Sequence, residues 1–191
     1  AREVEELLDH RGHAVPGGGL GFVQAREPVD VGELVKRAVD ELCAGHPGRT
    51  ITVSSAYDCT ASGDPERLVQ LFSNLVGNAV THGAGDAAIT VSVVGRPGEI
   101  VVEVHNQGVI PADRIATLFE PFRPRPRDAA RSSGLGLGLF ISHQIAAAHG
   151  GDITVESSPA AGTVVTVRLP RGTEGAGGSL VATVASPIRS R

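Results

Sequence analysis

One long amphipathic helix constrains the fold of this chain more than any other segment. Its start is marked by Asp64-Pro65, a capping residue followed by proline at the first helical position, and its end by Gly83. Its apolar residues recur at helical spacing and form a single stripe, which the helix buries against other elements. The residues of this stripe are Leu68, Leu71, Phe72, Leu75, Val76 and Ala79.

Further helix and strand patterns lie on both sides of this helix. A helix is predicted to begin after Asp30, with Glu33 in a capping-box position, and to stop near Gly45. Another is predicted over 139–149 and closes at Gly150-Gly151. Alternating apolar residues predict strands at 50–54, 89–94, 100–105, 153–156 and 163–169, and a short helix is predicted after Pro111.

Composition excludes several classes of function. The 191 residues carry a formal charge of -4, and without a basic excess we expect no nucleic-acid partner. No apolar run is long enough to span a membrane, so we expect this fragment to be cytoplasmic without direct membrane contact, whether or not the full-length protein is membrane-anchored. The sequence contains no methionine, which indicates a piece of a longer protein.

Two asparagines lie along one edge of the long helix. At 100° per residue, Asn74, Asn78 and Thr81 fall in one narrow stripe that borders the apolar face, so their side chains are expected to line a cleft at the edge of the core. An amide oxygen suits one position on Mg²⁺ while phosphates and waters fill the others. The alternative is that these asparagines only form hydrogen bonds to neighbouring backbone.

A second polar motif, His105-Asn106-Gln107-Gly108-Val109-Ile110-Pro111, directly follows a predicted strand. A polar residue and a glycine at the end of a strand put a hydrogen-bond acceptor at the edge of a sheet, where the backbone can approach a flat ring. Taken alone, the motif favours an ordinary turn.

Alternating glycines in Gly134-Leu135-Gly136-Leu137-Gly138-Leu139 run directly into a predicted helix. Backbone N–H groups of such a segment can turn toward an anion, and the helix N-terminus adds the positive end of its dipole, which favours phosphate. A flexible linker is the alternative. The motif follows no predicted strand and lacks the P-loop lysine, unlike a dinucleotide-binding turn or a P-loop.

The segment before these glycines is rich in proline and arginine and has no core pattern, which predicts a mobile loop. Arginine can bind phosphate through two hydrogen bonds, and a solvated charge run is the alternative. The arginines are Arg123, Arg125, Arg127 and Arg131.

Taken in order, these motifs resemble the catalytic domain of sensor histidine kinases. An Asn-x-x-x-Asn helix is followed by a strand with a short glycine turn, by Leu118-Phe119-Glu120-Pro121-Phe122 and by Gly-x-Gly-x-Gly. The resemblance covers residues 28–170. The phenylalanine box and His149-Gly150-Gly151 point to histidine kinases within the superfamily that also contains gyrase, Hsp90-type chaperones and MutL-type mismatch repair proteins.

The resemblance implies both a fold and a reaction. The implied fold is a two-layer α/β sandwich of the Bergerat ATP-binding type, with a mixed sheet and helices on one face. The implied cofactors are ATP and Mg²⁺, with ATP between the asparagine helix and an arginine-bearing lid. The implied activity is that of a two-component protein histidine kinase, which transfers the γ-phosphate to a histidine on a separate dimerisation domain of the same protein and signals to a response regulator.

The resemblance also assigns binding residues one by one, and it assigns no catalytic side chain to this chain. Asn78 matches the Mg²⁺ ligand, and Asn74 matches a residue that helps to hold the phosphates. Asn106 stands where the family usually has an aspartate that accepts a hydrogen bond from the adenine amino group, and Gly108 matches the first glycine of that motif. The other expected ATP contacts are His82, Ile110, Phe119, Phe122, Arg123, Gly134, Leu135, Gly136, Leu137 and Gly138.

Three positions depart from the family pattern. Asn106 keeps an acceptor oxygen but loses the charge, Val109 sits near where a second glycine is usual, and Thr81 replaces a usual phosphate-contacting lysine. The departures at Asn106 and Thr81 favour one alternative, a degenerate regulatory module that binds ATP or ADP without kinase activity. A second alternative is an anti-sigma-type serine kinase of the same superfamily, against which the phenylalanine box argues.

The resemblance divides the chain into three regions. Residues 1–27 are expected to be the end of a dimerisation helix and a linker, 28–170 the ATP-binding catalytic domain, and 171–191 a flexible C-terminal tail. His10 lies beyond the expected place of the phosphorylated histidine, so the acceptor is expected outside this chain.

Overall fold

The computed structural model describes residues 26–46, 48–121 and 137–172. The predictions of an N-terminal helix, of a mobile arginine loop and of a flexible tail therefore lie outside the described residues. In chain order the elements are β1 (Glu27–Asp30), α2 (Val31–Gly45), β2 (Ile51–Ala56), β3 (Thr60–Gly63), α3 (Pro65–His82), β4 (Ile89–Arg96), β5 (Glu99–Asn106), α4 (Ala112–Ile115), α5 (Gly138–Ala148), β6 (Asp152–Ser158) and β7 (Gly162–Pro170).

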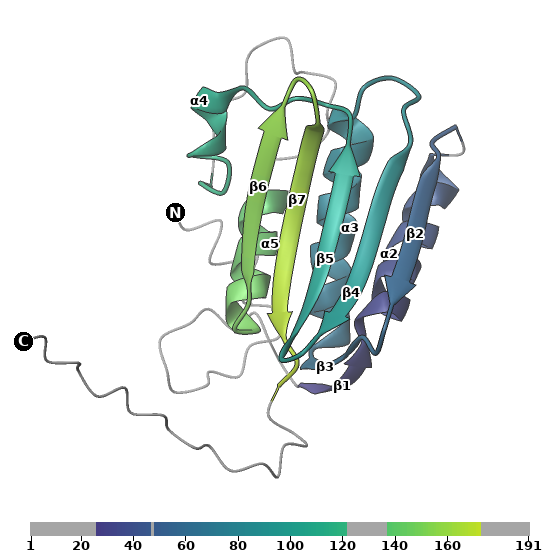
Figure 1. Ribbon diagram of the computed structural model, residues 1–191, viewed down its shortest axis with the longest axis vertical. Coiled ribbons are helices and arrows are strands. Elements are labelled where there is room, and N and C mark those ends of the chain that lie inside the picture. Colours follow the sequence, from purple (N-terminus) through teal and green to yellow (C-terminus); the bar gives the residue numbers. More distant parts are fainter. Residues whose placement is uncertain (1–25, 47, 122–136, 173–191) are drawn as a thin grey trace, which may run out of the picture.

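A five-stranded sheet forms one layer, in the order β2-β4-β5-β7-β6. Strands β2 and β4 pair in parallel, and the other neighbours pair antiparallel. Helices α2, α3 and α5 lie together behind this sheet in Figure 1. The expected two-layer α/β sandwich, with a mixed sheet and helices on one face, is confirmed. None of the helices in the described ranges has the length and apolarity that a bilayer span requires.

The predicted helix starts are confirmed by their capping bonds. Asp30 accepts hydrogen bonds from the N–H groups of Gly32 and Glu33, at 2.8 and 3.2 Å, and caps α2. Asp64 caps α3 in the same way, and that helix ends at His82 as the sequence indicated. The Glu33 side chain, predicted to complete a capping box, accepts from Lys36 at 2.6 Å instead.

The core lies between the sheet and the three long helices, and α3 is at its centre. The apolar stripe of α3 is buried, including Leu68, Leu71 and Phe72 at 1% exposure or less. Full burial of such a side chain stabilises the fold by about 1.5–3 kcal/mol. The inward residues of β4 and β5 complete the core, and they are Ile89, Val91, Val93, Ile100, Val102 and Val104. The edge of α3 is thus held at a fixed distance from the sheet.

A second, two-stranded sheet joins β1 to β3 and was not predicted from the sequence. Its register pairs Glu27 with Gly63 and Asp30 with Thr60. Both strands have only four residues, and the sequence of β3, Thr-Ala-Ser-Gly, carries too little apolar alternation to be recognised. The pairing links residues about thirty positions apart, so it follows from the tertiary fold and not from local pattern.

A buried histidine joins the end of α5 to the start of α3. His149 is 3% exposed. Its Nε2 accepts a hydrogen bond from the Asp64 N–H at 3.0 Å, and its Nδ1 lies 2.8 Å from the Ile145 carbonyl oxygen. An N–H partner on one side and a carbonyl on the other require a neutral ring with its proton on Nδ1.

Protonation of His149 is expected to destabilise the fold. Burial lowers the pKa of this histidine below its ordinary value of 6.5, the Ile145 carbonyl and Asp64 oppose that shift, and Arg26 reinforces it. A group whose pKa is lowered in the folded state contributes stability above its unfolded pKa and loses that contribution as the pH falls through the folded pKa. His149→Phe is expected to lose about 1–3 kcal/mol at neutral pH, because the Asp64 N–H loses its partner.

Urea unfolding measured from neutral pH down to about pH 5 checks this expectation. The parent should lose stability below pH 6.5 and His149→Phe should lose less over the same range. The control is His46→Phe, at an exposed histidine. Identical pH profiles for the parent and His149→Phe would contradict the assignment.

Candidate functional site

The edge of helix α3 carries the predicted polar stripe beside the buried apolar face. Asn74 and Asn78 are half-buried, whereas Thr81 and His82 are exposed. Asn74 and His82 are eight residues apart, which separates them by about 12 Å along the helix axis. The Thr81 hydroxyl donates to the Gly77 carbonyl of the same helix at 2.8 Å. The asparagines therefore lie where the core meets solvent, as the stripe predicted.

One end of this edge is joined to the start of α5. Asn74 Nδ2 donates to the Gly138 carbonyl oxygen at 3.3 Å, and Ser142 Oγ donates to the same oxygen at 2.9 Å. The backbone of Gly138 packs closely on α3, since a Cβ there would lie 3.6 Å from the Asn74 side chain. The asparagine helix and the last glycine of the glycine motif, distant in sequence, thus meet in the fold.

The start of α5 retains backbone donors suited to an anion. Leu137 is the N-cap residue, and it provides no side-chain hydrogen bond to the first turn. The first N–H groups of a helix have no partner within the helix, and the helix dipole favours negative charge near them. Gly138 opens α5, one residue before the predicted start at 139, whereas Gly134, Leu135 and Gly136 lie outside the described residues.

The other end of the α3 edge meets the loop after β5. Gly108 lies so close to α3 that a Cβ there would be 2.0 Å from the His82 carbonyl oxygen. No side chain fits at that distance, so this position requires glycine. Asn106 is near the same helix end, because a Cβ built on Gly83 would lie 3.6 Å from the Asn106 Cβ. The second polar motif therefore packs on the end of the asparagine helix.

Two hydroxyl side chains anchor this loop, and the sequence reasoning missed both. Thr163 Oγ1 donates to the Gly108 carbonyl at 2.8 Å, and Ser157 Oγ accepts from the Ile110 N–H at 2.8 Å. The two hydroxyls are themselves 2.8 Å apart. Both flank the predicted hairpin turn, but only the pairing of β5 with β7 and of β7 with β6 brings them to the loop. The loop is held in place by the protein itself.

Asn106 presents an enclosed amide at the end of β5. It shares the helix-facing side of the strand with Val102 and Val104 and is 6% exposed. Within the described ranges its side-chain amide forms no hydrogen bond. The fully buried side-chain atoms without a partner in these ranges are Arg49 Nε and Thr117 Oγ1, so the Asn106 amide keeps contact with the surface. The amide is therefore a candidate to bind a ligand.

Asn78 lies between the two ends of the site and has the donor atom that a hard cation prefers. It is half-buried, and among the described residues its amide has no hydrogen-bond partner. In the same part of the chain, no group of three His, Cys, Asp or Glu side chains could hold a metal ion. The Asn78 amide oxygen suits one position in the shell of a divalent cation, and Mg²⁺ accepts phosphates and water at its other positions.

Two further side chains support the two ends of the site. Phe119 packs against the core, and its ring centroid is 5.3 Å from that of His143 on α5. Arg49, which the sequence reasoning missed, donates from Nη2 to the Val80 carbonyl near the C-terminus of α3 at 3.1 Å. Phe122 and Arg123 lie outside the described residues.

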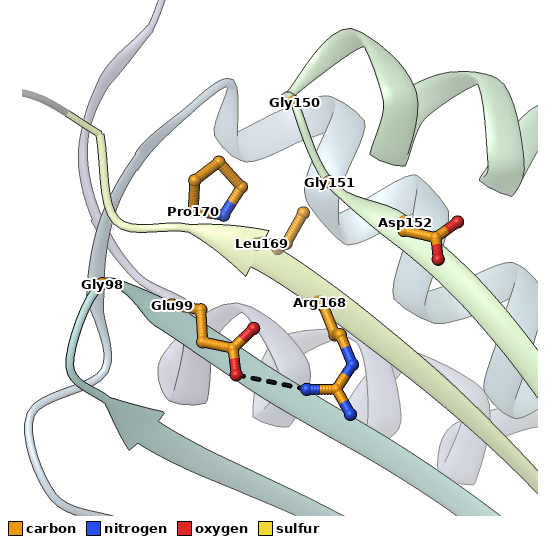
Figure 2. A pocket seen from close by; sticks show the side chains of 8 residues that line it. All are labelled: Gly98, Glu99, Gly150, Gly151, Asp152, Arg168, Leu169 and Pro170. Atoms are coloured by element: carbon orange, nitrogen blue, oxygen red, sulfur yellow. Dashed lines mark hydrogen bonds and ion pairs between the residues drawn. The ribbon is translucent and has the colours of Figure 1, made fainter. Parts of the chain in front are cut away.

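A shallow cavity of about 320 Å³ lies at the opposite end of the sheet. It is bounded by the start of β5, the end of β7 and the turn before β6, and Figure 2 shows the side chains of Glu99 and Arg168 pointing toward each other from neighbouring strands. These two side chains form an ion pair at 3.1 Å. Glu99 begins the strand that Asn106 ends, and none of the predicted site residues lines this cavity. It is separate from the candidate site.

Comparison with known proteins gives matches over most of the described elements. Residues 63–173 match the family described as histidine kinase-, DNA gyrase B-, and HSP90-like ATPase. The signal transduction histidine-protein kinase AfsQ2 of Streptomyces coelicolor is 42% identical over 109 residues, which are 56% of this chain and 20% of that protein. The sensor protein VanS of Enterococcus faecium is 38% identical over 165 residues, or 83% of this chain and 42% of that protein.

Among solved structures, the ATP-binding domain of PrrB from Mycobacterium tuberculosis is similar in fold, with a TM-score of 0.64 and 26% sequence identity. The superposition covers 78% of this chain and all of that domain. The chain spans less than half the length of the curated relatives AfsQ2 and VanS, and it corresponds in extent to the single PrrB domain.

Proposed function

Because the chain belongs to the histidine kinase-, DNA gyrase B- and HSP90-like ATPase family, we propose that it binds Mg-ATP along the edge of α3 for transfer of the γ-phosphate to a histidine. The observation that carries the proposal is the arrangement around that helix. Asn74 meets the start of α5 at one end, and the Asn106–Ile110 loop packs on the other. The site thus has a phosphate end and a base end.

Each end has the chemistry that its part of ATP needs. At the base end, Asn106 presents an enclosed amide and Gly108 lets the backbone approach a flat ring. At the phosphate end, the first turn of α5 offers N–H groups and Asn74 offers an amide. Asn78 stands between them as the single protein ligand proposed for Mg²⁺, which supplies charge neutralisation at the phosphates.

The contribution of these residues to the reaction is positioning. Phosphoryl transfer requires little covalent chemistry from the protein, and orientation and charge neutralisation account for most of the catalysis. The acceptor histidine belongs to a dimerisation domain of the same protein, and a response regulator receives the signal. The names of AfsQ2 and VanS as a histidine-protein kinase and a sensor protein support this assignment. The proposed domain covers residues 28–170 and acts in the cytoplasm.

Calorimetric titration of the chain with ATP, with and without Mg²⁺, tests the proposal. We expect saturable binding in the micromolar to millimolar range that Mg²⁺ strengthens, because Asn78 and the phosphates share the cation. The absence of binding at millimolar nucleotide would refute the proposed function. Binding by the chain without phosphorylation of the full-length protein would instead favour a regulatory nucleotide-binding module, for which Thr81, already bonded within its helix, is the supporting observation.

A further inference from the structure

Asn106 is placed so that its side chain meets the base end of the proposed site. It is the last residue of β5 and continues the inward series of Val102 and Val104, so its side chain lies in the layer between sheet and helices. The neighbouring backbone approaches it closely, since a Cβ on Gly108 would be 2.7 Å from Asn106 Nδ2. At 6% exposure, the residue has little contact with solvent.

The side-chain amide of Asn106 offers a hydrogen-bond donor and an acceptor. No residue in the described part of the chain fixes which of the two points in a given direction. Oδ1 accepts hydrogen bonds and Nδ2 donates them, and a half-turn about the last side-chain bond exchanges their places. No hydrogen bond from the described residues to either atom selects one orientation. A carboxylate at this position would offer acceptors only.

We propose that Asn106 lets the base end of the site accept 6-oxopurine nucleotides as well as 6-aminopurine nucleotides, an inference that rests on the proposed nucleotide-binding function. Toward adenine, Oδ1 accepts from the 6-amino group and Nδ2 donates to N1. Toward hypoxanthine, the turned amide donates from Nδ2 to O6 and accepts at Oδ1 from the N1–H. Both bases receive two hydrogen bonds, so neither leaves an enclosed polar group unpaired.

A carboxylate in the same place would match only one atom on the edge of either base. It would accept from the 6-amino group of adenine but face N1 with its second acceptor, and it would accept from the N1–H of hypoxanthine but face O6 with its second acceptor. An unmatched polar group of this kind weakens binding strongly. The substitution Asn106→Asp is therefore expected to weaken the binding of both nucleotides.

The test is calorimetric titration of the whole chain with Mg-ATP and with Mg-ITP, whose base is hypoxanthine. For the parent we expect the two Kd values to agree within about threefold, since the count of hydrogen bonds is the same. For Asn106→Asp we expect both Kd values to rise by about tenfold or more, because each base then meets one unmatched acceptor. The matched control is Gln70→Glu, which makes the same amide-to-carboxylate change outside the base end, on α3 beside Arg67, and should leave both Kd values unchanged.

The outcomes separate this inference from the proposed function. A parent that binds ATP but rejects ITP by more than about tenfold overturns the inference and leaves the proposed function intact. An Asn106→Asp variant that binds both nucleotides as tightly as the parent also overturns it. If neither nucleotide binds to the parent, both the proposed function and the inference fail. If thermal unfolding shows that Asn106→Asp does not fold, the ratio of the ITP Kd to the ATP Kd measured for the parent tests the inference by itself.

Discussion

Asn78→Ala is expected to weaken Mg-ATP binding by at least about tenfold. Removing a residue that only supports a metal ligand already lowers metal affinity or activity by about 10- to 100-fold, so removing a ligand should cost at least as much. We propose Asn78 as the only protein ligand to the cation. Among the described residues, no group of three metal-ligating side chains could take its place. The fold should survive, because the neighbouring apolar stripe of α3 is untouched and alanine favours helix. Calorimetric titration and thermal unfolding measure the two quantities.

Two controls make this result specific. Titration with ATP in the absence of Mg²⁺ should show nearly equal affinity for the parent and Asn78→Ala, because the deleted oxygen acts through the cation. Gln70→Ala removes an amide from the same helix whose Oε1 already accepts from Arg67 at 3.0 Å, and it should bind Mg-ATP like the parent. Equal Mg-ATP affinity for Asn78→Ala and the parent, with matched unfolding, would refute the metal-ligand role.

Gly108→Ala is expected to abolish nucleotide binding and to destabilise the fold. The added Cβ would lie 2.0 Å from the His82 carbonyl oxygen, which belongs to the backbone at the end of α3 and cannot move aside as a flexible side chain would. Relief requires the loop to shift, which breaks the hydrogen bond from Thr163 to the Gly108 carbonyl. Overpacking of this kind costs about 1–3 kcal/mol, and the displaced loop carries Asn106 away from the base.

The matched control is Gly45→Ala, at the last residue of α2, where an added Cβ meets nothing within 4 Å. Because alanine is also a better helix former than glycine, this variant should be at least as stable as the parent. Urea unfolding and Mg-ATP titration of both variants give the comparison. Parent-like stability and affinity for Gly108→Ala would show that the close contact with His82 does not shape the site.

Local sequence determined the helices of this protein and the identity of its site motifs. Asp30, Asp64 and Gly83 mark helix ends because capping and termination depend on residues within one turn. The apolar stripe of α3 placed Asn74 and Asn78 at the edge of the core for the same reason, since helical periodicity alone fixes which residues share a face. The order of the motifs was sufficient for the resemblance to histidine kinases and for the α/β fold that it implied.

The tertiary structure alone decided how these motifs meet. The sheet order β2-β4-β5-β7-β6 and the pairing of β1 with β3 join residues far apart in the chain, and no local pattern encodes such partners. The contact of Gly108 with His82 and the hydroxyl anchors from Ser157 and Thr163 depend on those pairings. Glycine and hydroxyl residues are common in turns, so their sequence signal is weak, and only the packed structure shows that they hold the loop after β5 in place.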